Sequence, residues 1–350
     1  MARRIVVTGG AGFIGGALID RLLALGDAEV ICLDKLTYAG NRFRLADQVA
    51  RGLTFRQVDL ADRKGVHDIL MAIQPELVFH LAAESHVDRS IDEPDPFVIT
   101  NVVGTSNVLA ACLDVQSAWG MDNPRGITLV HVSTDEVFGS AAPDELFSER
   151  SPYRPRSPYS ATKAAADHLV AAWRSTFGLR AIITNCSNNY GPYQFPEKLI
   201  PHTIIRALTD KAIPIYGDGQ HQRDWIYVDD HVSGLLAAAQ QGASGQTYLF
   251  GGRAVITNAD LVHRLCELLD STVSGSRSFL DRIVFVPDRP GHDRRYALDP
   301  TTTEQELDWR TSIDLETGLR ETVNWYLTHE QWWRDLLGAG YTAERLGLKP

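Results

Sequence analysis

Cysteine is scarce in this sequence, which has four among 350 residues: Cys32, Cys112, Cys186 and Cys266. They lie far apart and form no Cys-x-x-Cys pair, so the pattern argues against a disulfide framework and against a zinc site. We expect reduced, buried thiols, which favour a cytoplasmic protein that holds no metal.

Long apolar runs are missing as well. No stretch approaches the roughly 20 apolar residues of a membrane span, and the first residues lead directly into a strand-like segment. We therefore expect no signal peptide and no membrane partner.

Basic residues are in the minority, 34 against 44 acidic ones, for a formal charge of −10. Nucleic acid is therefore not an expected partner, and an anionic ligand would need a local basic pocket.

The chain alternates short apolar runs with helical patterns up to about residue 185. Strands are expected at Ile5–Thr8, Val30–Leu33, Leu53–Val58, Leu77–Leu81, Ile127–Val132 and Ala181–Thr184, and helices at Ile14–Leu25, Arg63–Ile73 and Asn101–Leu113 and from near Ser157. Strands that are apolar at nearly every position are typical of a parallel sheet covered on both faces. The fold class predicted is α/β, with a Rossmann-type doubly wound parallel sheet in residues 1–185. Residues 186–350 would form mainly a smaller α/β substrate-binding domain, while a helix and strand near 228–250 return to the first.

A glycine-rich turn, Thr8-Gly9-Gly10-Ala11-Gly12-Phe13-Ile14-Gly15, joins the first strand to the first helix. Glycines at this spacing permit a tight turn and let a pyrophosphate approach the helix N-terminus. Asp34 ends the second strand 19 residues after Gly15, where a carboxylate would accept hydrogen bonds from an adenosine ribose. This favours NAD over NADP, although nearby Lys35, Arg42 and Arg44 could serve a 2′-phosphate. A plain glycine turn followed by a surface acid is the alternative.

Tyr159 and Lys163 form a Tyr-x-x-x-Lys pair on a helix that follows Pro158. Four residues apart is one face of a helix, so the phenol and the ammonium can act on one substrate atom. A nearby cation stabilises phenolate and makes tyrosine a usable base. Alone, the pair could equally belong to an ordinary amphipathic helix.

Ser133-Thr134-Asp135-Glu136-Val137-Phe138-Gly139 follows the expected strand Ile127–Val132, at the sheet edge where ligands bind. Two adjacent carboxylates in a closed site suit an acid and a base, because burial and repulsion can separate their pKa values. The alternative is a capping box formed by Ser133 and Glu136.

Together these motifs resemble the extended short-chain dehydrogenase/reductase superfamily, and the Asp-Glu pair resembles its nucleotide-sugar 4,6-dehydratases, in particular those acting on dTDP-glucose. The segments carrying the likeness are residues 34–41 (DKLTYAGN), 80–90 (HLAAESHVDRS), 185–192 (NCSNNYGP), 196–201 (PEKLIP), 223–225 (RDW) and 288–293 (DRPGHD). The resemblance covers about Ile5 to Tyr326. It departs mildly at Gly16, at Phe138 and in a short loop from Ser140 to Ser151.

The resemblance implies the dehydration of dTDP-glucose to dTDP-4-keto-6-deoxyglucose by a lyase that regenerates tightly bound NAD in each cycle. Tyr159 would take the proton of the C4 hydroxyl while hydride passes from C4 to NAD⁺, with Thr134 bonded to the oxygen. Lys163 would hold the ribose and lower the pKa of Tyr159. Glu136 would remove the C5 proton and Asp135 would protonate the leaving C6 hydroxyl, before hydride returns to C6.

The resemblance also implies two sets of binding residues. The cofactor residues are Gly9, Gly12, Phe13, Ile14, Gly15, Asp34, Lys35, Thr37, Asp59, Leu60, Ala82, Ala83, Ser85, Thr100, Tyr159, Lys163 and Asn189. The nucleotide-sugar residues are Ser85, Thr134, Asn188, Glu197, Lys198, Leu199, Pro214, Tyr216, Arg223, Asn258, Arg289 and His292. Among the latter, Lys198, Arg223, Arg289 and His292 could supply the local cations that a diphosphate needs. A homodimer is expected through helices Asn101–Leu113 and Ser157–Phe177.

Some alternatives stay open at this point. A GDP-, CDP- or UDP-sugar 4,6-dehydratase, a UDP-sugar 4-epimerase or a decarboxylase would share the glycine turn and the Tyr-Lys pair, and a non-catalytic NAD-binding regulator would share the fold. The Asp135-Glu136 pair speaks against an epimerase and a decarboxylase, which expel no hydroxyl. His86, Asp88 and Arg89 could form an ion pair or act in catalysis. His80 and His131 are expected in the core.

Overall fold

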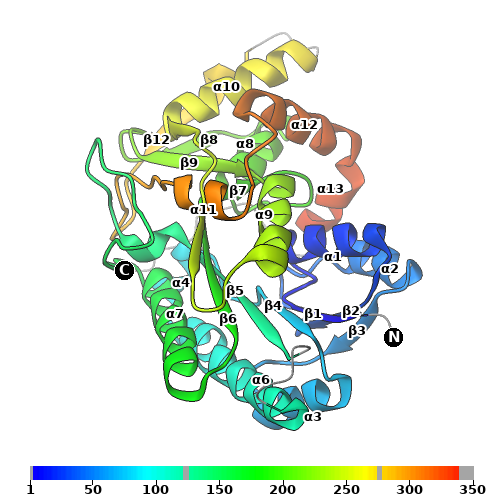
Figure 1. Ribbon diagram of the computed structural model, residues 1–350. Helices are drawn as coiled ribbons and strands as arrows, with labels where there is room; N and C mark the ends of the chain where they lie inside the picture. The colour runs from blue at the N-terminus through cyan, green and yellow to red at the C-terminus, as the bar shows by residue number, and fades with distance from the viewer. Residues whose placement is uncertain (1–2, 121–125, 274–277, 339–350) are drawn as a thin grey trace.

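The computed structural model describes residues 3–120, 126–273 and 278–338 (Figure 1). The first part runs β1 (Arg3–Thr8), α1 (Phe13–Leu25), β2 (Ala28–Asp34), α2 (Arg42–Ala50), β3 (Thr54–Gln57), α3 (Arg63–Ile73), β4 (Leu77–His80), α4 (Val87–Asp92), α5 (Asp95–Phe97), a π-helical segment (Val98–Gly104), α6 (Thr105–Trp119), β5 (Thr128–Thr134), a 3-10 turn (Asp135–Phe138), α7 (Pro158–Phe177) and β6 (Ala181–Cys186). It is followed by β7 (Asn188–Tyr190), α8 (Leu199–Leu208), β8 (Ile213–Tyr216), β9 (Gln222–Tyr227), α9 (Val228–Gln241), β10 (Thr247–Phe250), β11 (Val255–Thr257), α10 (Asn258–Thr272), a 3-10 turn (Phe279–Arg282), β12 (Ile283–Val286), α11 (Thr301–Glu306), α12 (Leu315–Thr328) and α13 (Glu330–Gly338).

The central sheet has seven strands in the order β10-β6-β5-β4-β1-β2-β3. Every neighbouring pair in it is parallel. From β1 the chain first adds β2 and then β3 on one side. It then crosses to the other side of β1 and adds β4, β5 and β6, so the direction in which strands are added reverses between β1 and β4. A crevice opens at such a reversal, outside the carboxyl ends of the strands. The predicted doubly wound parallel sheet is confirmed.

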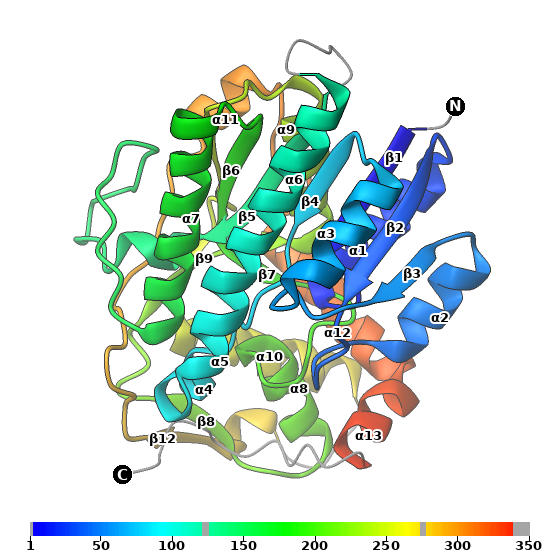
Figure 2. The same ribbon diagram turned by 90° about the horizontal axis from the view of Figure 1, so that it is seen from below.

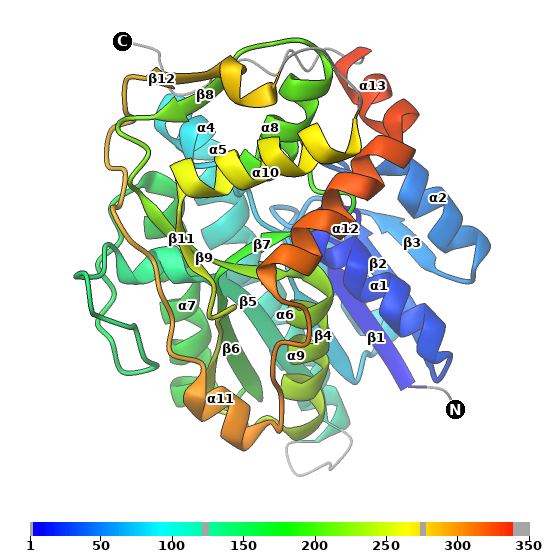
Figure 3. The ribbon, with the colours of Figure 1, turned by 90° about the horizontal axis from the view of Figure 1, so that it is seen from above.

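Alternate residues of each strand feed two separate cores. In β1, Ile5 and Val7 pack with α1 and α9, whereas Val6 packs with α3 and α6. The ribbons show the same layering, with α3, α6 and α7 on one face (Figure 2) and α1 and α9 on the other (Figure 3). Burial on both faces explains why the strand sequences are almost uniformly apolar.

The remaining elements form a smaller α/β part beyond one end of the sheet. It contains a three-stranded sheet, β11-β9-β7, and the pair β12-β8. Its own core includes Tyr190, Trp225, Leu265 and Trp333 from strands and helices of this part. The chain returns to the large sheet at α9, which packs on α1, and at β10, which pairs with β6.

One helical run is longer than the sequence analysis expected. Residues Asp95–Trp119 are continuously helical, and this run alone among the described helices is long and apolar enough to cross a membrane by length and composition. The expectation that no apolar stretch approaches membrane-spanning length was therefore wrong. However, 56% of the most apolar 18-residue segment of this run is buried. Its last part, α6, packs against α3 and α7, so the run is a core helix. The buried polar residues Thr100, Asn101 and Asn107 interrupt its apolar pattern, so the sequence analysis predicted a shorter helix.

Candidate active site

The glycine turn leaves no room for side chains. A Cβ at Gly15 would lie 2.3 Å from the Gly9 carbonyl oxygen, and one at Gly9, where φ is +71°, would lie 2.6 Å from the Ala82 nitrogen. Gly10 instead faces the core, where a Cβ would meet Ile19 and Cys32. The spacing that shapes the cavity is therefore Gly9, Gly12 and Gly15, a cradle suited to a pyrophosphate at the start of α1.

Asp34 organises the loop after β2. Its carboxylate accepts hydrogen bonds from the backbone nitrogens of Ala11 at 3.1 Å and Leu36 at 2.7 Å. Burial raises the pKa of Asp34, while both hydrogen bonds oppose the increase. Two of the basic residues that could serve the 2′-phosphate of NADP already have partners within the chain. Lys35 donates a hydrogen bond to Thr100 at 2.9 Å, and Arg44 forms an ion pair with Asp20 at 2.8 Å. These contacts favour NAD.

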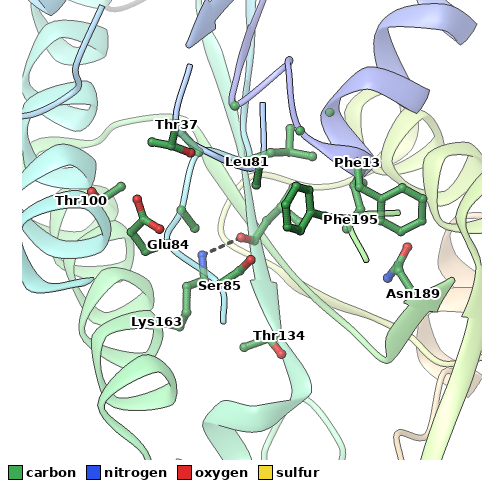
Figure 4. Close-up of a pocket in the computed structure, with 18 of the residues that line it drawn as sticks. Phe13, Thr37, Leu81, Glu84, Ser85, Thr100, Thr134, Lys163, Asn189 and Phe195 are labelled. Carbon is green, nitrogen blue, oxygen red and sulfur yellow. Dashed lines mark hydrogen bonds between the residues drawn. The ribbon is translucent and has the colours of Figure 1, made fainter. Parts of the chain in front are cut away.

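A cavity of about 300 Å³ runs from this turn to the ends of β4, β5 and β6. All the expected cofactor residues line it, as do Thr134, Asp135 and Glu136. Figure 4 shows Phe13, Phe195 and Asn189 on one side of it and Thr37, Thr100 and Glu84 on the other. The structure thus brings together residues far apart in the sequence, although their individual roles remain a prediction.

The two acidic side chains at the end of β5 occupy different environments. Asp135 is 2% exposed, and its Oδ2 has no hydrogen-bond partner among the described residues. Burial and then the nearby Glu136 carboxylate raise the pKa of Asp135 well above its ordinary value. Burial also raises the pKa of Glu136, but cationic Arg289 and Lys198 counteract this. The chain therefore favours a protonated Asp135 beside a more readily ionised Glu136.

The alternative capping box between Ser133 and Glu136 is absent. Thr134 is the N-cap residue, and its hydroxyl accepts from the Glu136 nitrogen at 3.3 Å. The Ser133 hydroxyl instead donates to Asp167 at 2.7 Å. Capping therefore places Glu136 through its backbone and leaves its side chain at the cavity.

Tyr159 and Lys163 lie on the first turns of α7, which begins with a Ser157 capping box. Burial and the Glu136 carboxylate raise the pKa of Tyr159 well above its ordinary value. Burial lowers the pKa of Lys163, whose Nζ donates to the Val132 carbonyl oxygen at 2.8 Å. The lower tyrosine pKa that the resemblance implies is thus not produced by the chain's own groups.

A second cavity, of about 180 Å³, adjoins the first and shares Glu136, Asn188, Glu197 and Lys198 with it. Its lining includes the remaining expected nucleotide-sugar residues: Leu199, Pro214, Tyr216, Arg223, Asn258, Arg289 and His292. Arg289 pairs with Asp88 at 2.8 Å, which supports the ion-pair interpretation of Asp88, while the buried Arg289 Nε has no partner among the described residues. A buried, unpaired donor in a cavity suits an anionic ligand.

His292 differs from what the sequence analysis expected of a cation. Burial, followed by the charges of Arg289 and Arg223, lowers the pKa of His292 to about 3. Its Nδ1 lies 2.7 Å from an Asp288 oxygen, and its ring stacks on His221 at 3.7 Å between centroids. Burial and the two arginines therefore favour a neutral imidazole, in contrast to the cation that the sequence analysis expected.

Several contacts around the site had no sequence signal. Glu197, expected to bind sugar, accepts hydrogen bonds from Tyr38 at 3.1 Å and Arg89 at 3.3 Å. Arg89 also stacks on the Tyr38 ring at 3.8 Å. These contacts tie the loop after β2 to the segment before α8, and both segments line the cavity. His86 caps α4, so the structure gives it a local structural role.

The two expected core histidines are buried, each 1% exposed. His80 contacts Thr8 at 2.8 Å and Thr105 at 3.0 Å, so both of its ring nitrogens have partners. His131 Nε2 contacts Asp167 at 3.1 Å, whereas its Nδ1 has no partner among the described residues. The four cysteines are likewise buried and free.

Comparison with known proteins independently supports the family resemblance seen in the sequence. The family model described as GDP-mannose 4,6 dehydratase matches residues 6–322. A probable dTDP-glucose 4,6-dehydratase of Sinorhizobium fredii is 49% identical, with 99% of each chain covered. The dTDP-glucose 4,6-dehydratase 1 of Escherichia coli is 47% identical, covering 97% of this chain and 96% of its own. A Streptomyces venezuelae dTDP-glucose 4,6-dehydratase solved with NAD bound has a TM-score of 0.86 at 41% identity, with 95% of this chain and 99% of that one covered.

Proposed function

This chain belongs to the NAD-dependent nucleotide-sugar 4,6-dehydratases, and from that premise we propose how its residues divide the conversion of dTDP-glucose to dTDP-4-keto-6-deoxyglucose. The reaction is that of a hydro-lyase with NAD as cofactor. The observation that carries the assignment is the position of Asp135 and Glu136. They lie beside Tyr159 and Lys163 in one cavity, and Glu136 also lines the second.

The cofactor fits the first cavity because the glycine cradle admits a pyrophosphate and Asp34 stands at the end of β2. Phe13, Ile14, Thr37 and the other expected cofactor residues would hold it along the cavity wall. When bound, NAD supplies a reversible hydride acceptor, which takes hydride from the sugar C4 and gives it back at C6. Because NAD ends unchanged, tight retention through the cycle serves this reaction.

The chain's own residues move the protons. Tyr159 removes the proton of the C4 hydroxyl, and Thr134 hydrogen-bonds the same oxygen. The resulting 4-ketone acidifies the C5 proton, which Glu136 accepts as the base. Protonated Asp135 gives its proton to the leaving C6 hydroxyl, so water departs, and C5 is reprotonated at the end. The opposite protonation states favoured for the two carboxyl groups support this division.

The second cavity is proposed to bind the nucleotide diphosphate. Lys198, Arg223 and Arg289 gather three cations there in a chain of formal charge −10. Arg223 is buried, with its guanidinium 4.2 Å from the centroid of the Tyr296 ring. Fixed, buried guanidinium groups bind a diphosphate with geometric specificity.

The division of the chain follows the same logic. We assign NAD binding to residues 1–185 together with 228–250, and nucleotide-sugar binding mainly to the rest of 186–350. The exposed apolar side chains Val98, Ile99 and Val103 on the Asp95–Trp119 helix support a homodimer. The free, buried thiols support a cytoplasmic location.

The deciding test is mass spectrometry of dTDP-glucose after incubation with the purified protein and no added cofactor. We expect the sugar nucleotide to lose one water. Asp135→Asn and Glu136→Gln should each slow this loss about 10²-fold or more, because each removes one proton-transfer group. Glu316→Gln, on the exposed surface of α12, is the matched control and should turn over normally.

An unchanged mass would lead first to added NAD⁺ and then to UDP-, GDP- and CDP-sugars. Epimerisation leaves the mass unaltered, so chromatographic separation of the product would reveal that alternative. If NAD is retained but no sugar nucleotide turns over, the chain is a non-catalytic NAD-binding protein.

A further inference from the structure

Asp167 is a buried carboxylate behind the active site for which the proposed mechanism has no use. It lies on α7, two turns after Tyr159 and one turn after Lys163, and is 1% exposed. Its two oxygens contact four polar groups: Ser133 Oγ at 2.7 Å, Tyr153 Oη at 2.9 Å, His131 Nε2 at 3.1 Å and Asn185 Nδ2 at 3.5 Å. These donors come from β5, β6 and the loop before α7, so one side chain joins three segments.

Two of these donors lead directly to the reacting residues. Ser133 precedes Thr134 on β5, and the Asn185 amide, besides contacting Asp167, donates to the Thr134 carbonyl oxygen at 2.9 Å. Asp167 therefore fixes the carboxyl ends of β5 and β6 at the point where Thr134, Asp135 and Glu136 enter the cavity. A catalytic group must be held within a fraction of an ångström, and such buried contacts provide that precision.

The same carboxylate interacts electrostatically with Lys163, one helical turn away. Four donors aimed at two oxygens match an ionised carboxylate, which only accepts hydrogen bonds. The other titratable groups that interact with Lys163 are Cys186, His80 and His131. Burial raises the pKa of Cys186 to about 12 and lowers the pKa of both histidines, so these three are neutral. Asp167 is thus the counter-charge that opposes the desolvation of the lysine.

We propose that Asp167 is a positioning residue for the dehydration: it holds the Thr134-Asp135-Glu136 segment in place and keeps Lys163 protonated beside Tyr159. The inference rests on the proposed function. It assigns to one side chain both the geometry of the acid-base pair and the charge state of the lysine. Neither task brings Asp167 into contact with substrate or cofactor.

The test is Asp167→Asn, which keeps the size of the side chain and removes its charge. We expect kcat for dTDP-glucose to fall at least about tenfold, while KM changes less than about threefold, because the binding cavities are untouched. Without its counter-charge Lys163 should lose its proton more readily. The alkaline limb of the kcat–pH profile should therefore move to lower pH by about one unit. Tyr159, Asp135 and Glu136 also titrate at this site, and they are unchanged in the variant.

Asp230→Asn is the matched control. Asp230 is equally buried, on α9, and accepts hydrogen bonds from Ser312 and Ile313. This variant should lose thermal stability but keep the kcat–pH profile of the wild type. If Asp167→Asn also keeps that profile and the wild-type kcat, the proposal is wrong.

Ser133→Ala tests the same idea should Asp167→Asn fail to fold. It removes one donor to Asp167 without creating a buried charge, and we expect kcat to fall about threefold or more with KM retained. A normal kcat in Ser133→Ala would contradict the positioning role. A wild-type protein that does not turn over dTDP-glucose in the same assay would instead contradict the proposed function, so the two failures are separate.

Discussion

Two adjacent carboxyl groups acquire different chemistry here from their surroundings alone. Asp135 points into a buried space with one oxygen unpartnered, whereas Glu136 faces the side of the cavity that carries Arg289 and Lys198. An opposite charge stabilises a carboxylate, while burial destabilises it. Two neighbouring residues at the end of β5 therefore differ in how readily they ionise, as the proposed acid and base require.

Tyr159→Phe tests the residue that we propose begins the reaction. The change removes the hydroxyl proposed to take the C4 proton while keeping the ring that packs near Phe97, so kcat should fall about 10²–10⁴-fold. NAD retention should stay near that of the wild type. Steady-state kinetics and mass spectrometry of the released cofactor measure the two quantities.

Tyr248→Phe is the control for that variant. The Tyr248 hydroxyl accepts from the Ala243 nitrogen at 3.0 Å, near the amino end of β10 and away from the cavity. Its loss should leave kcat unchanged. Activity of Tyr159→Phe within tenfold of the wild type would show that another group removes the proton.

Motifs made of neighbours in sequence were predictable at this scale, and pairs brought together by the fold were not. The glycine turn, the Asp-Glu pair and the Tyr-Lys pair each lie within a few residues, so spacing reveals them. Tyr38 and Glu197 are 159 residues apart, and Asp167 binds Ser133 across 34. The lowered pKa of His292 was not predictable either, because burial and neighbouring arginines cannot be read from the sequence.

At the scale of elements, the turn between β1 and α1 offers a sharp comparison. In Gly15→Ala the new methyl would lie 2.3 Å from the Gly9 carbonyl oxygen, a rigid backbone atom. In Gly16→Ala it would meet the Arg44 side chain at 3.1 Å, which can move. We expect Gly15→Ala to bind NAD at least tenfold more weakly, about 1.4 kcal/mol, and Gly16→Ala to bind it normally.

Calorimetric titration of NAD into both variants, after the retained cofactor has been removed, measures this difference. Equal affinities would mean that the close approach at Gly15 does not shape the cofactor cradle. Thermal unfolding of each variant would separate lost binding from lost folding.

Elements of the large sheet were predictable because both of their faces are buried. Helix α3 has the predicted bounds, Arg63–Ile73, and β1, β2, β5 and β6 extend the predicted runs by one or two residues at an end, although β5 begins one residue later than predicted. The short strands β7, β8, β11 and β12 were not predicted, because the alternation of apolar runs and helical patterns ends near residue 185. Where polar side chains are buried, as along Asp95–Trp119, the apolar pattern underestimates the length of a helix.

The Asp95–Trp119 helix carries the next prediction. Ile99 and Val103 are 47% and 44% exposed and four residues apart, so they lie on one face. If that face joins two copies, the double change Ile99→Lys and Val103→Lys places charges in an apolar interface and should yield a monomer. Light scattering on a size-exclusion column measures the mass.

Val49→Lys on α2 is the control, because Val49 is 45% exposed on a helix outside the expected interface. It should leave the mass of the wild type unchanged. A double variant that remains dimeric would place the interface elsewhere, and a monomeric wild type would remove the homodimer from the proposed function.

At the scale of the whole molecule, the site exists because the chain crosses between its two parts. The first part alone would hold the glycine turn and the Asp135-Glu136 pair, but Arg223, Asn258 and Arg289 all come from the second. The return of α9 and β10 to the large sheet anchors the second part over the carboxyl ends of the strands. The alternation of apolar runs and helical patterns, and its end near residue 185, indicated both parts. The contacts across the cavity follow only from the packing of these parts.

Burying histidine in a folded chain makes stability depend on pH. Burial lowers the pKa of His231 from an ordinary 6.5 to about 3. The unfolded chain therefore takes up a proton as pH falls below 6.5, while the folded chain takes it up only near 3. The stabilisation is complete above 6.5 and is lost as pH falls toward 3, at about 1.4 kcal/mol for each unit.

Urea unfolding at pH 7.5 and 5.5 checks this, comparing the wild type with His231→Asn. Buried carboxyl groups with raised pKa values, such as Asp224, oppose the histidine effect, so the wild-type curve alone does not isolate it. The variant lacks the titrating ring, so its loss of unfolding free energy between the two pH values should be smaller by about 1.4 kcal/mol. Equal losses in wild type and His231→Asn would mean that His231 is protonated in the folded chain at pH 5.5.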